Sequence, residues 1–285
     1  MRPFQLKEDR VYVGRAIPRD EDRRLLCGRG EFTDDIRLAD CAHLVFVRSP
    51  HAHARIVSIN VEAARAMPGV LTVFDAKIWK THDVGVDLPL EWEVGFPDGR
   101  AMNSVPRPIF AQEKVCHVGV AVAAVVARTL AQAEEAAALI EVDYEALPAV
   151  TEVHSALARD AIVIHESTGT NAVFETRLGD SAHVDGVLSR SYHVTTIDVH
   201  ANRVTGAPME PRTCLGDYDP RRERYTLWST GQLLNAMRRW LSTTFRCRTD
   251  QVRVVLPDVG GGFGTRAYYY PEQAVVLLAS QVCGC

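Results

Sequence analysis

The chain has 285 residues, 47% of them hydrophobic and 24% charged, and its formal net charge is -4. This length indicates two domains, and this composition is typical of a globular protein with a substantial core. The negative charge argues against a nucleic-acid partner, and no apolar run approaches the roughly 18 residues that predict a membrane span. No secretory signal follows Met1, so we expect a cytoplasmic protein with neither nucleic acid nor membrane as a partner.

The first half of the chain predicts a mixture of strands and short helices. Residues 1–22 are charged and irregular and form an N-terminal segment. Apolar runs predict strands, and stretches rich in alanine and glutamate predict helices. The strands are expected at 44–49, 56–61, 71–76, 118–127 and 140–150, and the helices at 61–70 and 129–140. We assign an α+β domain to residues 23–151 and a linker to residues 152–170.

The second half, residues 171–285, also predicts α+β structure. An alternating strand is expected at 190–200, a hairpin at 213–229, a helix at 233–245 and a strand at 252–257. A last helix is expected to begin at Pro271, because proline is well tolerated in the first turn of a helix. If that helix lacks packing partners, its apolar face is exposed and favours aggregation.

The segment DVGGGFGTR, residues 258–266, lies between the predicted strand at 252–257 and this last helix. Glycines let backbone N–H groups approach a ligand closely, and the start of a helix favours an anion. Neither a P-loop nor the dinucleotide pattern GxGxxG is present. The segment is therefore either a tight turn or a site for an anionic ligand, and Phe263 either packs into the core or faces a planar ligand.

Several segments occur in an order that is specific when taken together. They are GRGEFTDD, VRSPHAHARI, VDYEALPAV, ANRVTGAPMEPR and PDVGGGFG. In this order they resemble the large, molybdenum-binding subunit of the xanthine dehydrogenase, aldehyde oxidase and carbon monoxide dehydrogenase family. The resemblance implies an a/b hammerhead domain at 23–151, followed by the first, incomplete part of a molybdenum-cofactor-binding α+β domain at 171–285.

The resemblance also implies a cofactor and a site. The cofactor is molybdenum-molybdopterin, in its plain or cytosine dinucleotide form, and the family hydroxylates an aldehyde, N-heterocycle or similar carbon centre with oxygen from water. The family's cofactor loop matches Gly261, Gly262, Phe263 and Gly264, and its glutamine next to the molybdenum matches Gln232. The 2Fe-2S and FAD groups that take up the electrons are expected on an iron–sulfur subunit and an FAD subunit, not on this chain.

Two departures from the family pattern limit these expectations. Purine-oxidising members carry a glutamate where this chain has Ala267, which argues against xanthine as the small-molecule substrate. The family's large subunits are also longer, and the additional part supplies the catalytic glutamate. No catalytic residue is therefore assigned here. We expect a truncated chain that is inactive without the remaining part of the large subunit. The alternative is a non-catalytic fragment that docks to the iron–sulfur and FAD subunits.

Three other features have simple structural interpretations. His51 and His53 resemble a metal pair, but no third ligand is suitably spaced, so no metal site is predicted. Glu210 and Arg212 are expected to form a local salt bridge or a turn, or to support the cofactor cleft. The seven cysteines include no CxxC pair, which is typical of reduced thiols.

Overall fold

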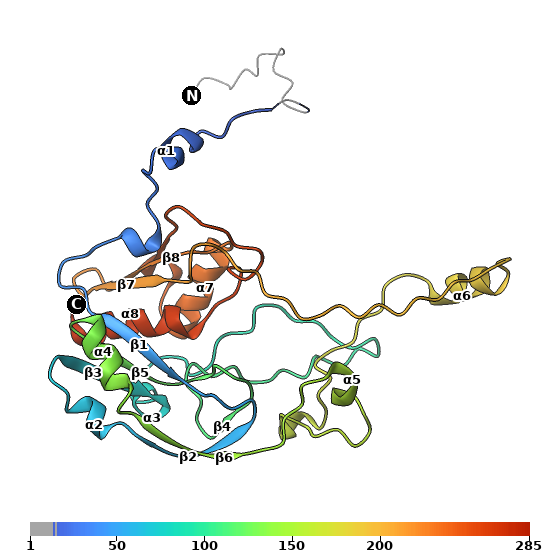
Figure 1. Ribbon diagram of the computed structural model, residues 1–285, viewed down its shortest axis with the longest axis horizontal. Helices are drawn as coiled ribbons and strands as arrows, with labels where there is room; N and C mark the ends of the chain where they lie inside the picture. The colour runs from blue at the N-terminus through green and yellow to red at the C-terminus, as the bar shows by residue number, and fades with distance from the viewer. Residues whose placement is uncertain (1–13, 15) are drawn as a thin grey trace.

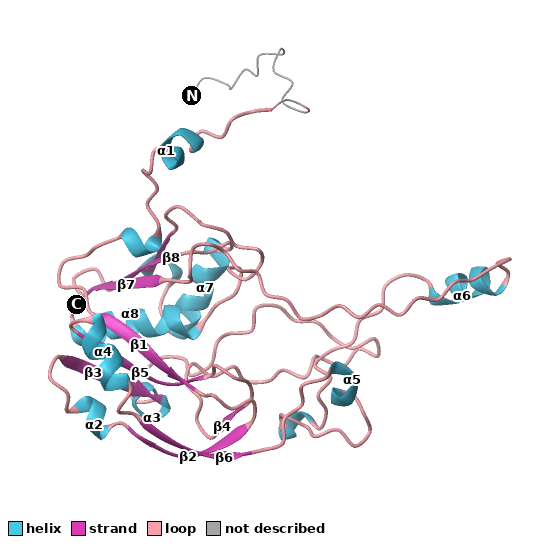
Figure 2. Cartoon of the chain, in the orientation of Figure 1, coloured by secondary structure: helices cyan, strands magenta, loops and turns pink. Residues whose placement is uncertain are grey.

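The computed structural model describes residues 14 and 16–285, so most of the predicted N-terminal segment lies outside the described residues. The chain forms three small sheets with helices packed between and around them (Figures 1 and 2). This arrangement confirms the predicted α+β class. No helix in the described part of the chain is long and apolar enough to cross a membrane.

The first sheet has the strand order β1-β5-β3, and all of its pairs are antiparallel. All seven residues of the central strand β5 are buried, which explains their small and branched side chains. Ala124 and Val126 face the largest core cluster, whereas Ala123 and Val125 face a second cluster beneath α2 and α4. The strands and flanking helices are β1 (His43–Arg48), β3 (Val70–Asp75), β5 (Ala121–Ala127), α2 (Glu62–Arg65), α3 (Ala76–Trp79) and α4 (Leu130–Ala137).

Side-chain caps define where two of these helices begin. Asp75 accepts a hydrogen bond from the backbone N of Ile78 at 2.7 Å, and Thr129 accepts one from Gln132 at 3.2 Å. Each cap satisfies an N–H group that has no partner inside the helix.

The second sheet has the order β4-β2-β6, with β2 at Ala54–Asn60, β4 at Lys114–Val115 and β6 at Glu141–Ala146. The strands predicted in the first half of the chain are thus confirmed.

The segment that follows the second sheet is folded back on itself. Asn171 holds it together, because its side chain accepts a hydrogen bond from Ile164 N and donates to the carbonyls of Ala156 and Ile162. Lys114 in β4 also donates to the carbonyl of Ile164, at 2.6 Å. The short helices here are α5 (Val153–Ala156) and η2 (Glu166–Thr168).

Residues 173–209 form an extended arm that leaves the body of the molecule and carries α6 (Ser181–Ser189) (Figure 1). The predicted strand at 190–200 is wrong: this stretch pairs with no strand in the described part of the chain and lies exposed. An alternating pattern of side chains does not form a strand by itself, because the backbone N–H and C=O groups must also pair with those of a neighbouring strand.

The third sheet has the order β7-β8-β9, with β7 and β8 antiparallel and β8 and β9 parallel. The predicted hairpin and the helices on either side of β9 are confirmed. Met237, Trp240, Leu241 and Phe245 form the buried face of α7, while Leu233 stays exposed just before it. The bounds are β7 (Cys214–Asp219), β8 (Arg224–Ser229), α7 (Leu234–Thr244), η3 (Thr249–Gln251), β9 (Val252–Val255) and α8 (Pro271–Cys283).

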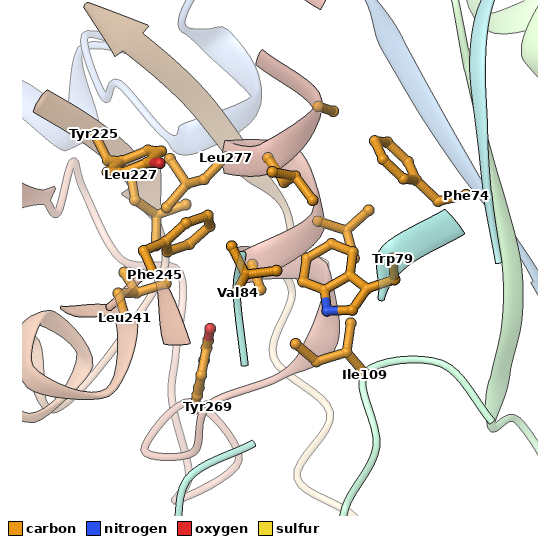
Figure 3. Packing of buried hydrophobic residues seen from close by; sticks show 14 of the residues in the cluster. Phe74, Trp79, Val84, Ile109, Tyr225, Leu227, Leu241, Phe245, Tyr269 and Leu277 are labelled. Carbon is orange, nitrogen blue, oxygen red and sulfur yellow. The ribbon is translucent and has the colours of Figure 1, made fainter. Parts of the chain in front are cut away.

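Helix α8 has packing partners on both sides. It lies between the third sheet and the first, and its residues Ala274, Val275, Leu277 and Leu278 are buried in the largest core cluster (Figure 3). That cluster also includes Phe74, Trp79 and Ile109 from the first half of the chain and Tyr225, Leu227 and Tyr269 from the second. One continuous core therefore joins the two predicted domains, and the last helix does not leave its apolar face exposed.

Candidate functional site

The glycine-rich loop, residues 258–264, follows β9 and is anchored at its first residue. Asp258 accepts hydrogen bonds from Arg24 Nη2 at 2.6 Å and from the backbone N of Glu31 at 2.8 Å. In return, its own N–H donates to the carbonyl of Glu31 at 2.8 Å. The Arg24 guanidinium, followed by the Glu31 N–H, lowers the pKa of Asp258 to about 2. Helix α1 (Asp22–Leu26), which carries Arg24, and the segment after it thus fix where the loop begins.

The backbone of the loop depends on left-handed conformations. Gly261 and Gly264 have φ of 114° and 80°, and Phe263 has φ of 47°. A left-handed phenylalanine is uncommon, and such strain is concentrated at functional sites. Its side chain is 74% exposed. Of the two interpretations left open by the sequence, packing into the core is therefore excluded in this structure.

The loop leaves a row of backbone donors free. The N–H groups of Gly261, Gly262, Phe263 and Gly264 find no acceptor among the described residues. Residues on either side are satisfied, since Gly260 N donates to Glu210 Oε2 and Thr265 N donates to the Gly262 carbonyl. Successive N–H groups in turns with left-handed residues form concave sites for anions and other acceptors.

Gln232, predicted from the resemblance, lies directly against this loop. An added Cβ on Gly262 would be 2.7 Å from Gln232 Cδ, so any larger residue there would displace the glutamine side chain. Gln232 N donates to the Arg266 carbonyl at 3.1 Å, and Arg266 N donates back to Gln232 Oε1 at 3.3 Å. Because the amide oxygen is engaged, Nε2 is the polar atom that Gln232 has left for a ligand. The fold therefore brings together the candidate residues from 232 and from 261–264.

The local salt bridge expected between Glu210 and Arg212 is not formed. Glu210 Oε2 instead accepts from Gly260 N at 2.8 Å, and Arg212 lies over the ring of Tyr270 with its guanidinium 3.9 Å from the centroid. Arg212 Nη2 also approaches Glu272 Oε1 at 3.8 Å. The salt bridge does not form because the two side chains diverge on either side of Pro211, that of Glu210 toward the glycine loop and that of Arg212 toward α8. Of the alternatives, support of the loop by Glu210 fits this geometry.

Arg266 is a residue that sequence reasoning missed. It is only 4% exposed, and its guanidinium donates to Thr230 Oγ1 at 2.6 Å and to the Glu210 carbonyl. Burial lowers the pKa of Arg266 from its usual value. An arginine between a glycine loop and the apolar run AYYY was the available signal, because a charged side chain in such a context must find buried partners.

A cavity of about 680 Å³ lies on the other side of Arg266, and none of the glycine-loop residues lines it. Its walls come from residues 33–42, from β1 and β7, and from α8 between Glu272 and Ser280. Arg48 and Glu272, which both line it, form an ion pair across it at 2.6 Å. Arg266 thus separates the cavity from the loop.

The histidine pair considered as metal ligands serves packing. His53 is buried and its Nδ1 lies 2.7 Å from the Pro148 carbonyl, while the ring of His51 packs against Tyr144 at 4.8 Å between centroids. Within residues 14 and 16–285, no group of three or more His, Cys, Asp or Glu side chains is placed to hold a metal ion.

Two sequence families match the chain. Residues 27–148 match the a/b hammerhead domain of aldehyde oxidase and xanthine dehydrogenase, and residues 164–285 match the molybdopterin cofactor-binding domain. The second match contains the glycine loop and Gln232. The resemblance inferred from the sequence motifs is confirmed.

Individual proteins agree with these matches. The nicotine 6-hydroxylase large subunit of Paenarthrobacter nicotinovorans is 33% identical over 95% of this chain, and the carbon monoxide dehydrogenase large chain of Afipia carboxidovorans is 32% identical over 95%. The crystal structure of quinoline 2-oxidoreductase from Pseudomonas putida 86 superposes with a TM-score of 0.84 at 34% identity, covering 95% of this chain and 33% of that one. The chain spans about a third of the length of the curated relatives it matches, 32% and 34% for these two.

Proposed function

The chain belongs to the xanthine dehydrogenase, aldehyde oxidase and carbon monoxide dehydrogenase family of molybdenum hydroxylases, and we propose that its glycine loop and Gln232 form one wall of a molybdopterin site. The observation that carries this proposal is the row of free N–H groups at 261–264 beside the free Nε2 of Gln232. All of these groups are hydrogen-bond donors. Such a set fits a ligand rich in oxygen acceptors and negative charge, as a molybdenum-pterin phosphate is.

Each residue of this wall has a distinct task. Gln232 Nε2 and the N–H groups of the loop would hold oxygen acceptors of the cofactor. The exposed ring of Phe263 offers an apolar face against which a planar substrate packs. When bound, the cofactor supplies the two-electron redox centre, and the protein contributes binding and orientation. We also propose that the cofactor is the cytosine dinucleotide form of molybdopterin.

The proposed reaction is the hydroxylation of an aldehyde, an N-heterocycle or a similar carbon centre. The substrate carbon exchanges a hydrogen for a hydroxyl group whose oxygen comes from water, and two electrons and two protons are released. The electrons pass to 2Fe-2S and FAD groups on partner subunits. Ala267 after the loop disfavours xanthine as the substrate. Because the relatives are about three times as long, we expect turnover only together with the remaining part of a large subunit.

Isotopic labelling tests this function. The chain, assembled with the rest of a large subunit and its partner subunits, is incubated with quinoline or an aromatic aldehyde in water enriched in ¹⁸O. The hydroxylated product should carry ¹⁸O, and the 285-residue chain alone should give no product. The proposal would be contradicted by product whose new oxygen derives from O₂, or by the absence of product with both quinoline and the aromatic aldehyde.

The exposed arm favours a second candidate function, a docking fragment for the iron–sulfur and FAD subunits. Twelve of its large apolar side chains are exposed, which is unusual for a surface that meets only water. They are Val173, Phe174, Leu178, Val184, Val187, Leu188, Tyr192, Val194, Ile197, Val199, Val204 and Met209.

Size-exclusion chromatography of the chain mixed with these two subunits distinguishes the candidates. Docking through the arm predicts a complex that Ile197→Ser weakens and that Val57→Ser, at an exposed site on β2, leaves intact. A complex insensitive to Ile197→Ser, or no complex, would remove this candidate.

A further inference from the structure

A chain of buried hydrogen bonds runs behind the glycine loop. It begins at Gly260 N, which donates to Glu210 Oε2 at 2.8 Å. The carbonyl of Glu210 then accepts from the guanidinium of Arg266, which also donates to Thr230 Oγ1 at 2.6 Å. The chain ends where the backbone of Arg266 exchanges two hydrogen bonds with Gln232. The start of the loop is thus tied to the Glu210 side chain, Gln232 is tied to the backbone of Arg266, and the Arg266 guanidinium joins Glu210 to Thr230.

The packing around this network leaves little freedom. An added Cβ on Gly260 would be 2.5 Å from Glu210 Cβ, so the backbone of the loop touches the glutamate directly. Glu210 is 9% exposed and Arg266 4% exposed. Among the described residues, the hydrogen-bond partners of the Arg266 guanidinium are two neutral oxygens, Thr230 Oγ1 and the Glu210 carbonyl.

This arrangement is a poor source of stability. A buried charge that is not paired with an opposite charge is costly, and an apolar residue of similar size would avoid that cost. Glu210 Oε1 and Arg266 Nε find no partner among the described residues, but the hydrogen bonds that are formed hold the bonded groups in one geometry, because such bonds are stronger in a buried site than in water. This network fixes the positions of the free N–H donors at 261–264 and of the Gln232 amide.

We propose that Glu210 and Arg266 are positioning residues that aim the donors of the glycine loop and of Gln232 in one common direction. Glu210 holds the first glycine, and Arg266 sets both the end of the loop and the orientation of the Gln232 amide. The consequence for cofactor binding rests on the proposed function, whereas the positioning itself is a property of the chain without any ligand.

Amide hydrogen exchange of the 285-residue chain tests the positioning. Thr230→Val removes the hydroxyl that holds Arg266 and keeps the side-chain volume, and Thr230→Ser keeps the hydroxyl. The loss of a hydrogen bond from a buried charged group predicts exchange about tenfold to a hundredfold faster in Thr230→Val at the two hydrogen-bonded amides of the network, those of Gly260 and Arg266. Exchange in Thr230→Ser should stay close to that of the unmodified chain, and exchange over β5 should stay unchanged in both.

Control variants distinguish local loosening of the loop from a general loss of stability. Thr243→Val removes an exposed hydroxyl of α7 that donates to a backbone carbonyl, and it should leave the loop unaffected. At the other end of the network, Glu210→Ala should accelerate loop exchange, and Glu210→Gln, which keeps an acceptor for Gly260 N, should largely restore it. Equal acceleration over the loop and β5, or an unchanged loop in both Thr230→Val and Glu210→Ala, would overturn the proposal.

Molybdenum content of the assembled protein separates this proposal from the proposed function. Selective loosening of the loop together with a large loss of bound molybdenum supports both. Selective loosening with full molybdenum content supports the positioning role and refutes the cofactor wall. Uniform exchange in a protein that retains molybdenum refutes the positioning role alone.

Discussion

The contact between Gly262 and Gln232 gives a sharp test of the candidate site, because these residues are far apart in the sequence. An alanine at 262 would place its Cβ 2.7 Å from Gln232 Cδ and 2.8 Å from Oε1. Real Cβ atoms do not approach other atoms so closely, so the glutamine must leave its position. It then loses the 3.3 Å hydrogen bond from Arg266 N.

The expected cost follows from these contacts. A lost hydrogen bond destabilises the fold by about 1 kcal/mol, and a displaced rotamer adds about 0.5–1.5 kcal/mol. The stiffer unfolded chain of an alanine variant returns about 0.4–1 kcal/mol. Gly262→Ala should therefore lower the free energy of unfolding by about 1 kcal/mol. In a Gln232→Ala background the clash is absent, and the same change should be neutral or slightly stabilising, which gives a coupling of about 1–2 kcal/mol.

Urea unfolding of the four chains in this cycle measures the coupling. Gly231→Ala is the control, since its Cβ would meet nothing closer than Leu256 Cδ1 at 3.5 Å. Equal effects of Gly262→Ala in both backgrounds would refute the contact and with it the arrangement of the site.

Three further predictions concern the scaffold. Gly216→Ala should lower the free energy of unfolding by about 1–3 kcal/mol, measured in urea, because its Cβ would lie 2.8 Å from the carbonyl carbon of Val276 in α8. The pKa of Asp258 is lowered to about 2, so the ionised carboxylate should stabilise the fold fully above about pH 4. This stabilisation should be lost as the pH falls toward 2, and an Asp258→Asn chain should not show this loss in acid unfolding. Burial raises the pKa of Cys214 to about 12, so iodoacetamide at pH 8 should label exposed Cys27 well before Cys214, as followed by mass spectrometry.

Each scaffold prediction has a clear opposite result. A Gly216→Ala chain as stable as the unmodified one would mean that α8 does not approach β7 closely. An acid-unfolding profile identical in Asp258→Asn would mean that the ion pair with Arg24 does not form. Equal labelling of the two cysteines would mean that Cys214 is accessible; labelling both in urea provides the control for intrinsic reactivity.

The parts of the fold that the sequence predicted are those determined by local patterns. The run AVAAVVA identified a fully buried strand because it contains no polar residue, and it is the central strand β5. The stretch 213–229 identified a hairpin because a turn at Asp219-Pro220 separates two alternating runs. The glycine loop was recognised from its composition and its position between a strand and a helix.

The parts that escaped prediction depend on distant partners. The alternating pattern at 190–200 predicted a strand, but no described segment supplies the neighbouring ladder. Arg212 follows Glu210 closely in the sequence, yet the two turn toward different elements. The roles of Glu210 and Arg266 arise only when residues 210, 230 and 260 meet in the folded chain, which no local pattern encodes.

We propose that the glycine loop and Gln232 hold a molybdenum cofactor. Metal analysis of the chain, assembled with the rest of a large subunit in cells that make molybdopterin, tests this proposal. We predict molybdenum and pterin in equal amounts in the unmodified protein, and a loss of both in a Gly262→Leu variant that keeps its circular dichroism spectrum and its core stability. Full molybdenum and pterin content in that folded variant would contradict the account.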